Sequence, residues 1–133
     1  LIFVKIRHIG IAVDSIEDRL PMWESLGLKL DHTENVGSEG VTTAHLKVGG
    51  YEIELLEPMG KDTPVGKFID KKGPGIHHLA LEVDDIEESL AKAKKNGLEA
   101  IGEAPRPGAD NTLVAFFHPK DTGGVLLEIV QCD

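Results

Sequence analysis

The sequence has only one cysteine, Cys132, so no disulfide can form within the chain. Such cysteine usage is typical of a reducing compartment, and we expect a cytoplasmic protein. Basic residues are also few, because 14 Lys and Arg stand against 23 Asp and Glu, and the formal net charge is −9. Nucleic-acid binding needs clustered Lys and Arg, so this charge argues against a nucleic-acid partner. No apolar run approaches the roughly 20 residues of a membrane-spanning helix, and we expect no membrane partner.

An internal repeat is the most informative feature that is present. Residues 78–87 repeat the pattern of residues 8–17, with His, Val, Asp, Ile and Glu at matching positions. The same offset continues through Gly27 and Gly97. A histidine repeated inside a repeated strand pattern suggests one site that is built from two halves.

Each copy predicts the same order of elements, β-α-β-β-β. Alternating apolar residues predict the first strand, and an apolar stripe before a glycine predicts the helix. In the first copy we expect a strand at 5–13, a helix to about Leu26 that Pro21 disturbs, and strands at 28–35, 41–48 and 51–57. In the second copy we expect a strand at 77–83, a helix at 86–96 and strands at 98–101, 112–118 and 125–131, with a loop at 104–110.

The chain is therefore predicted to be a single α+β domain, residues 1–133, made of tandem βαβββ modules. Module one covers about 5–58, a connecting helix or loop covers 59–75, and module two covers about 76–131. A helix covers only one face of each module's sheet. Two modules side by side can form one curved mixed sheet around a shared concave surface.

Four residues at matching positions of the two modules predict a metal site. Glu54 and Glu128 each interrupt a strongly apolar strand, where an unpaired carboxylate would be costly to bury. Together with His8 and His78 they offer the imidazole and carboxylate ligands that suit a divalent transition metal. A lone strand histidine is usually structural, but the recurrence of all four residues favours metal binding.

At these residues the sequence resembles the vicinal oxygen chelate superfamily, and within it the methylmalonyl-CoA epimerases. The resemblance covers nearly the whole chain and is carried by residues 8–13, 54–60, 62–69, 75–78, 108–109 and 118–128. It implies the vicinal oxygen chelate fold, in which the curved mixed sheet surrounds a metal-binding cleft. It also implies an isomerase that interconverts (2R)- and (2S)-methylmalonyl-CoA by α-proton abstraction and a metal-stabilised enolate.

The resemblance further implies the cofactor and the partners. The divalent ion is expected to be cobalt or manganese, with zinc or nickel as alternatives. The expected substrate is an acyl-CoA, and the expected assembly is a homodimer. Lys120, in the run His118-Pro119-Lys120, is the basic residue that we expect to contact CoA. Other basic residues near the predicted cleft loops are Lys61, Lys67, Lys71, Lys72 and Arg106.

Epimerisation needs one proton carrier on each face of the reacting carbon. The resemblance gives Glu128 an acid/base role. Some epimerases have a carboxylate where this chain has Thr43, which is too weak an acid to replace it. His45, two residues later on the same strand face, is our candidate for the second carrier, with Glu54 or a water on the metal as alternatives.

Three other functions are compatible with parts of the pattern. A glyoxalase I-type lactoylglutathione lyase would use the same four ligands on a glutathione hemithioacetal. An iron ring-cleaving dioxygenase uses two histidines and one carboxylate, and is less favoured because this chain offers a fourth ligand. A non-catalytic small-molecule binding or resistance module would need no metal, so metal analysis separates it from the enzymes.

Overall fold

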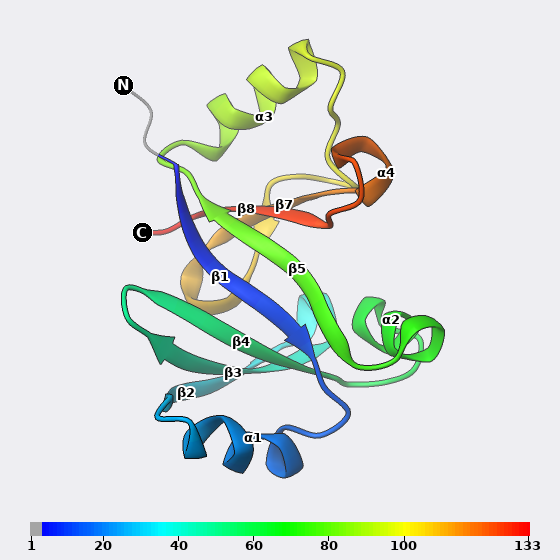
Figure 1. Cartoon of the computed structure of the whole chain (residues 1–133). Coiled ribbons are helices and arrows are strands. Elements are labelled where there is room, and N and C mark those ends of the chain that lie inside the picture. Colours follow the sequence, from blue (N-terminus) through cyan, green and yellow to red (C-terminus); the bar gives the residue numbers. More distant parts are fainter. Residues whose placement is uncertain (1–3) are drawn as a thin grey trace. The chain divides into compact units, whose positions relative to one another are not determined.

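The computed structural model describes residues 4–133 (Figure 1). These residues form two compact units, one of residues 8–77 and one of residues 4–7 with 78–133. They are called the 8–77 unit and the 78–133 unit. No helix among the described residues has the length and apolar character needed to cross a bilayer.

The 8–77 unit is built on a four-stranded mixed sheet. Its elements are β1 (Lys5–Ala12, from residue 8 on), α1 (Ile16–Ser25), β2 (Lys29–Val36), the 3-10 turn η1 (Gly37–Glu39), β3 (Val41–Val48), β4 (Tyr51–Pro58) and α2 (Pro64–Lys72). The strand order is β2-β3-β4-β1. β1 runs parallel to β4, and the other neighbours are antiparallel. The first and last strands of the unit therefore lie side by side.

Alternation along β3 gives this sheet two different faces. Ala44 and Leu46 belong to a buried apolar core, against which Leu20 and Trp23 of α1 pack. Thr43 and His45 alternate with these residues and therefore point to the opposite face of the sheet. Both are almost completely buried, so the face opposite α1 carries buried polar groups.

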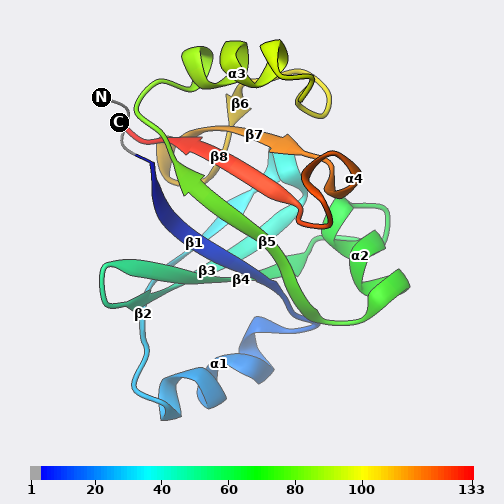
Figure 2. The same cartoon turned by 45° about the horizontal axis from the view of Figure 1, so that its top comes forward.

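The 78–133 unit repeats this plan. Its elements are β5 (Gly75–Glu82, from residue 78 on), α3 (Ile86–Lys95), β6 (Arg106–Pro107), the 3-10 turn η2 (Ala109–Asn111), β7 (Leu113–Phe117), α4 (Pro119–Thr122) and β8 (Leu127–Gln131). The strand order is β5-β8-β7-β6, with β5 parallel to β8 and the other neighbours antiparallel. Figures 1 and 2 both show α3 over β7 and β8. Ile86 of α3 packs in one apolar core with Ala115, Phe117 and Ile129 of β7 and β8.

The α+β class and the tandem βαβββ order are confirmed, and two local predictions are wrong. Residues 98–101 form no strand, because Ile101 makes only a single backbone bond to Phe116, N–H to O at 2.8 Å. The second strand of this unit in chain order is instead β6, which lies inside the predicted loop at 104–110. Pro21 lies inside α1, which begins at Ile16 and continues to Ser25, so the proline does not delay the start of the helix. The single domain with its module limits stays a prediction.

Candidate metal-binding and catalytic residues

In the 8–77 unit, His8 and Glu54 form a buried pair on neighbouring strands. β1 and β4 run parallel, and Glu54 lies opposite Gly10 in the register. The distance from His8 Nδ1 to Glu54 Oε2 is 3.4 Å. The two residues are only 5% and 6% exposed, so the carboxylate is buried beside an imidazole rather than in water.

His45 has hydrogen-bond partners at both ring nitrogens. Its Nε2 lies 2.8 Å from the Thr43 hydroxyl, and its Nδ1 lies 3.2 Å from Glu52 Oε1. Nδ1 is also 3.7 Å from Glu54 Oε2, because His45 lies opposite Glu54 in the β3–β4 register. The ring of His32 stacks on the His45 ring, with centroids 4.2 Å apart. These contacts fix the orientation of the His45 ring.

Glu52 belongs to this network, although the sequence pattern did not indicate it. The hydrogen bond from His45, with a smaller contribution from Lys47 at 3.1 Å, lowers the pKa of Glu52 to about 2. Glu52 is therefore ionised and accepts a hydrogen bond from the N–H at His45 Nδ1. His45 Nε2 then accepts a hydrogen bond from the Thr43 hydroxyl. The available signal was its spacing, two residues before Glu54 on the same strand face. His45, Glu52 and Glu54 also offer ligand atoms within 4.8 Å of one another.

In the 78–133 unit, His78 and Glu128 form the matching pair. β5 runs parallel to β8, with Ala80 opposite Glu128. His78 Nε2 lies 2.9 Å from Glu128 Oε1, and both side chains are buried. The edge of the Phe116 ring meets the His78 ring, with centroids 5.7 Å apart and an interplanar angle of 81°. An apolar aromatic ring therefore lies next to the His78–Glu128 pair.

The donor chemistry of the two pairs fits a divalent metal ion. Each unit contributes one histidine from its first strand and one glutamate from its last strand. In each pair an imidazole nitrogen and a carboxylate oxygen approach within 3.4 Å among buried residues. Neutral imidazole and carboxylate are ligands of zinc, manganese, cobalt and nickel. Binding of all four residues to one ion stays a prediction.

Lys120 lies on the short helix α4 and is exposed. Its backbone N–H donates to His118 Nδ1 at 3.1 Å, so His118 caps α4. The predicted contact between Lys120 and CoA stays a prediction.

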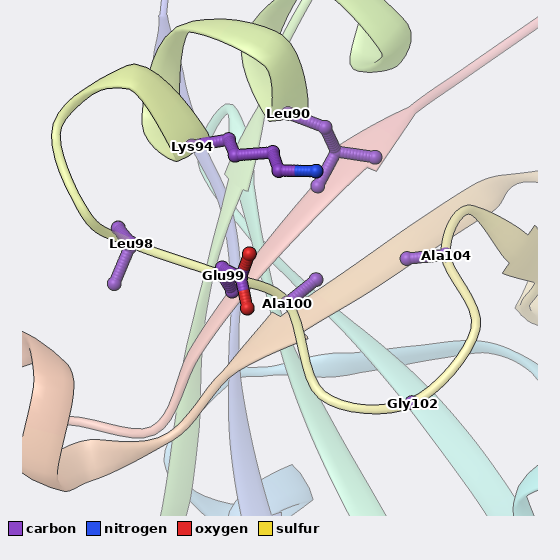
Figure 3. Close-up of a pocket in the computed structure, with 7 residues that line it drawn as sticks. All are labelled: Leu90, Lys94, Leu98, Glu99, Ala100, Gly102 and Ala104. Carbon is purple, nitrogen blue, oxygen red and sulfur yellow. The ribbon is translucent and has the colours of Figure 1, made fainter.

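A surface hollow of about 280 Å³ lies elsewhere in the 78–133 unit, beside α3 (Figure 3). Leu90 and Lys94 of α3 face the segment that follows the helix, and the other lining residues are Leu98, Glu99, Ala100, Gly102 and Ala104. None of these residues belongs to the predicted site. The hollow therefore adds no group to it.

Comparisons with known proteins cover nearly the whole chain. Residues 7–116 match the model of the glyoxalase/bleomycin resistance protein/dioxygenase superfamily. Human mitochondrial methylmalonyl-CoA epimerase is 34% identical over 96% of this chain and 73% of its own. A hypothetical protein from Bacillus halodurans has a solved structure with 47% identity and a TM-score of 0.94, covering 98% of this chain and 95% of that one.

A ligand-bound structure is also similar. A variant of Streptomyces coelicolor methylmalonyl-CoA epimerase in complex with 2-nitronate-propionyl-CoA is 34% identical, with a TM-score of 0.92. The match covers 96% of this chain and 94% of that one. This likeness confirms the vicinal oxygen chelate fold predicted from the sequence.

Proposed function

The chain belongs to the glyoxalase/bleomycin resistance protein/dioxygenase superfamily, and we propose that it is a metal-dependent methylmalonyl-CoA epimerase. One observation carries the proposal. Two symmetric, buried His–Glu pairs occur in a chain that is 34% identical to epimerases over 96% of its length. A non-catalytic module has no need of such pairs.

The proposed metal ligands are His8 and Glu54 of the 8–77 unit with His78 and Glu128 of the 78–133 unit. A divalent ion bound there, cobalt or manganese in this proposal, would supply the positive charge that stabilises the negative charge formed when the α-proton leaves. Zinc and nickel accept the same ligands. The burial of both pairs strengthens their electrostatic effect, because little water screens them.

Glu128 is the proposed proton carrier on one face of the substrate. One of its oxygens contacts His78, and a carboxylate has a second oxygen that can take or return the α-proton. His45 is the proposed carrier on the other face, and its contacts define a route. The Thr43 oxygen receives the α-proton while its own hydroxyl proton moves to His45 Nε2, and the carboxylate of Glu52 stabilises the imidazolium that forms. The reverse direction moves both protons back, so Thr43 only passes a proton on and need not be a strong acid.

The remaining expectations complete the proposal. Lys120 is proposed to contact the CoA moiety, because it is an exposed cation on the short helix α4. A cytoplasmic homodimer is the proposed state of the protein. The homodimer and the Lys120 contact follow from the resemblance of the sequence to epimerases, and the cytoplasmic location follows from the single cysteine.

Hydrogen exchange at the α-carbon tests the activity. The protein, reconstituted with cobalt or manganese, is mixed with (2S)-methylmalonyl-CoA in deuterated water. We expect one deuteron at the α-carbon and formation of the (2R) epimer, and the metal-stripped protein serves as the control. Absence of exchange in both reconstituted samples would contradict the proposal. A parallel assay with the hemithioacetal of methylglyoxal and glutathione distinguishes a lactoylglutathione lyase.

A further inference from the structure

Strand register places Arg106 on the same face of the 78–133 sheet as the His78–Glu128 pair. Residues paired directly across neighbouring strands share a face. Glu128 is paired with Phe116, and Arg106 is paired with Val114, two residues before Phe116 on the same side of β7. The alternating residues of β7 instead face α3 and its apolar core. Arg106, His78 and Glu128 therefore lie on the face of this sheet that α3 does not cover.

The Phe116 ring connects Arg106 to this pair. The Arg106 guanidinium carbon lies 5.5 Å from the centre of the Phe116 ring, and the same ring meets His78. The side chain of Arg106 also donates from Nη1 to the carbonyl oxygen of Ile101 at 3.4 Å. A guanidinium has five N–H groups in a planar fork, so it can bind a carboxylate beside the contacts that it already makes.

The turn after Arg106 is closely packed. The backbone N–H of Gly108 donates to the Thr112 carbonyl at 3.0 Å, and the Thr112 hydroxyl donates to the Ala109 carbonyl at 2.7 Å. A Cβ at Gly108 would lie 2.6 Å from Val114 Cγ1, so only glycine allows this approach between the turn and β7. The turn thus holds the backbone of Arg106 in a fixed place on the sheet.

The acidic chain needs a local positive charge if it is to bind an anionic acyl group. The formal net charge is −9, which disfavours the approach of an anionic substrate. A methylmalonyl group carries a free carboxylate, whereas an ordinary acyl group of the same size carries none. Arginine binds a planar carboxylate with two parallel N–H···O bonds, which lysine cannot do.

We propose that Arg106 binds the free carboxylate of the acyl group and so selects malonyl-type thioesters over neutral ones. The inference rests on the proposed function, since it assigns the specificity of the same site. Arg106 would bind the carboxylate next to the metal ligands while Phe116 holds the guanidinium in place. The residue is then a determinant of specificity rather than a proton carrier.

Equilibrium binding tests this independently of the rate of epimerisation. Calorimetric titrations of the metal-loaded protein compare methylmalonyl-CoA with isobutyryl-CoA, which has a methyl group in place of the carboxylate. We expect the wild-type chain to prefer methylmalonyl-CoA. We expect Arg106→Gln to reduce this preference by about 10- to 100-fold, the typical contribution of a hydrogen bond to a charged group. Arg106→Lys keeps the charge without the fork and should give an intermediate preference.

Lys94→Gln is the matched control, because it removes one positive charge from α3, on the other face of the sheet. It should leave the preference unchanged. An equal loss of affinity for both thioesters in Arg106→Gln would overturn the inference, because the guanidinium would then act on the CoA portion. An unchanged preference in a folded Arg106→Gln protein would also overturn it. A wild-type chain that binds neither thioester would instead contradict the epimerase proposal itself.

Discussion

At the scale of single residues, Glu52 shows how a side chain outside the predicted ligand set can control the site. It accepts from His45 and contacts Lys47, and its pKa is lowered to about 2, mainly by the hydrogen bond from His45. His45 in turn lies within 3.7 Å of Glu54. The ionised form of Glu52 therefore holds the ring that contacts a proposed metal ligand.

This carboxylate predicts a pH dependence of stability. Its pKa is about 2 in the folded chain and near the ordinary 4.5 in the unfolded chain, so the unfolded state binds the proton more readily between these values. The stabilisation is complete above about pH 4.5 and is lost as the pH falls toward 2. Urea unfolding of metal-free protein across this range should show a steeper loss for wild type than for Glu52→Gln. If the free energy of unfolding falls equally with pH in both proteins, folding does not lower the pKa of Glu52.

At the scale of elements, the two module helices begin in the same way. Ser15 caps α1 by accepting from the Asp18 N–H, and Asp85 caps α3 by accepting from the Glu88 N–H at 3.2 Å. Both caps lie three residues after the end of the first strand of their unit, so they set where the chain turns from sheet to helix. Ile86, the first residue of α3, follows the second cap directly and is completely buried in the core against β7 and β8.

Replacing the second cap should destabilise the 78–133 unit. We expect Asp85→Ala to lower the free energy of unfolding by about 1 kcal/mol, because the Glu88 N–H loses its acceptor. Asp84→Ala is the control, since this exposed neighbour carries the same charge one residue before the cap. Chemical denaturation measures both variants. A similar loss in the two proteins would assign the effect to charge rather than to capping.

The sequence predicts elements and ligand candidates well where the repeat supplies two copies of the same pattern. His8, Glu54, His78 and Glu128 stand out because each has a counterpart. The predicted strand at 98–101 rested on Leu98 and Ile101, which are apolar residues typical of strands. Tertiary contacts instead pair β7 with β6, and the sequence alone does not show this choice. Glu52 and the stack of Arg106 on Phe116 depend on register between strands, which a single sequence does not reveal.

At the scale of the whole molecule, each compact unit supplies one His–Glu pair. If all four residues bind one ion, we expect one metal per chain and a higher melting temperature with metal than without. His8→Ala and His78→Ala should each lower metal content sharply, although they lie in different units. Elemental analysis and thermal unfolding measure the two effects. Retention of one full equivalent in either variant would mean that a single pair suffices.

The parallel pairing of first and last strands has a consequence for how the chain acquires its site. His78 lies on β5, and its partner Glu128 lies on β8, which is the last strand of the unit to be synthesised. Contacts between residues so far apart in sequence raise the contact order, and high contact order slows folding. During translation, this His–Glu pair can form only after β8 has left the ribosome. The 78–133 unit thus completes its sheet and this ligand pair in the same late event.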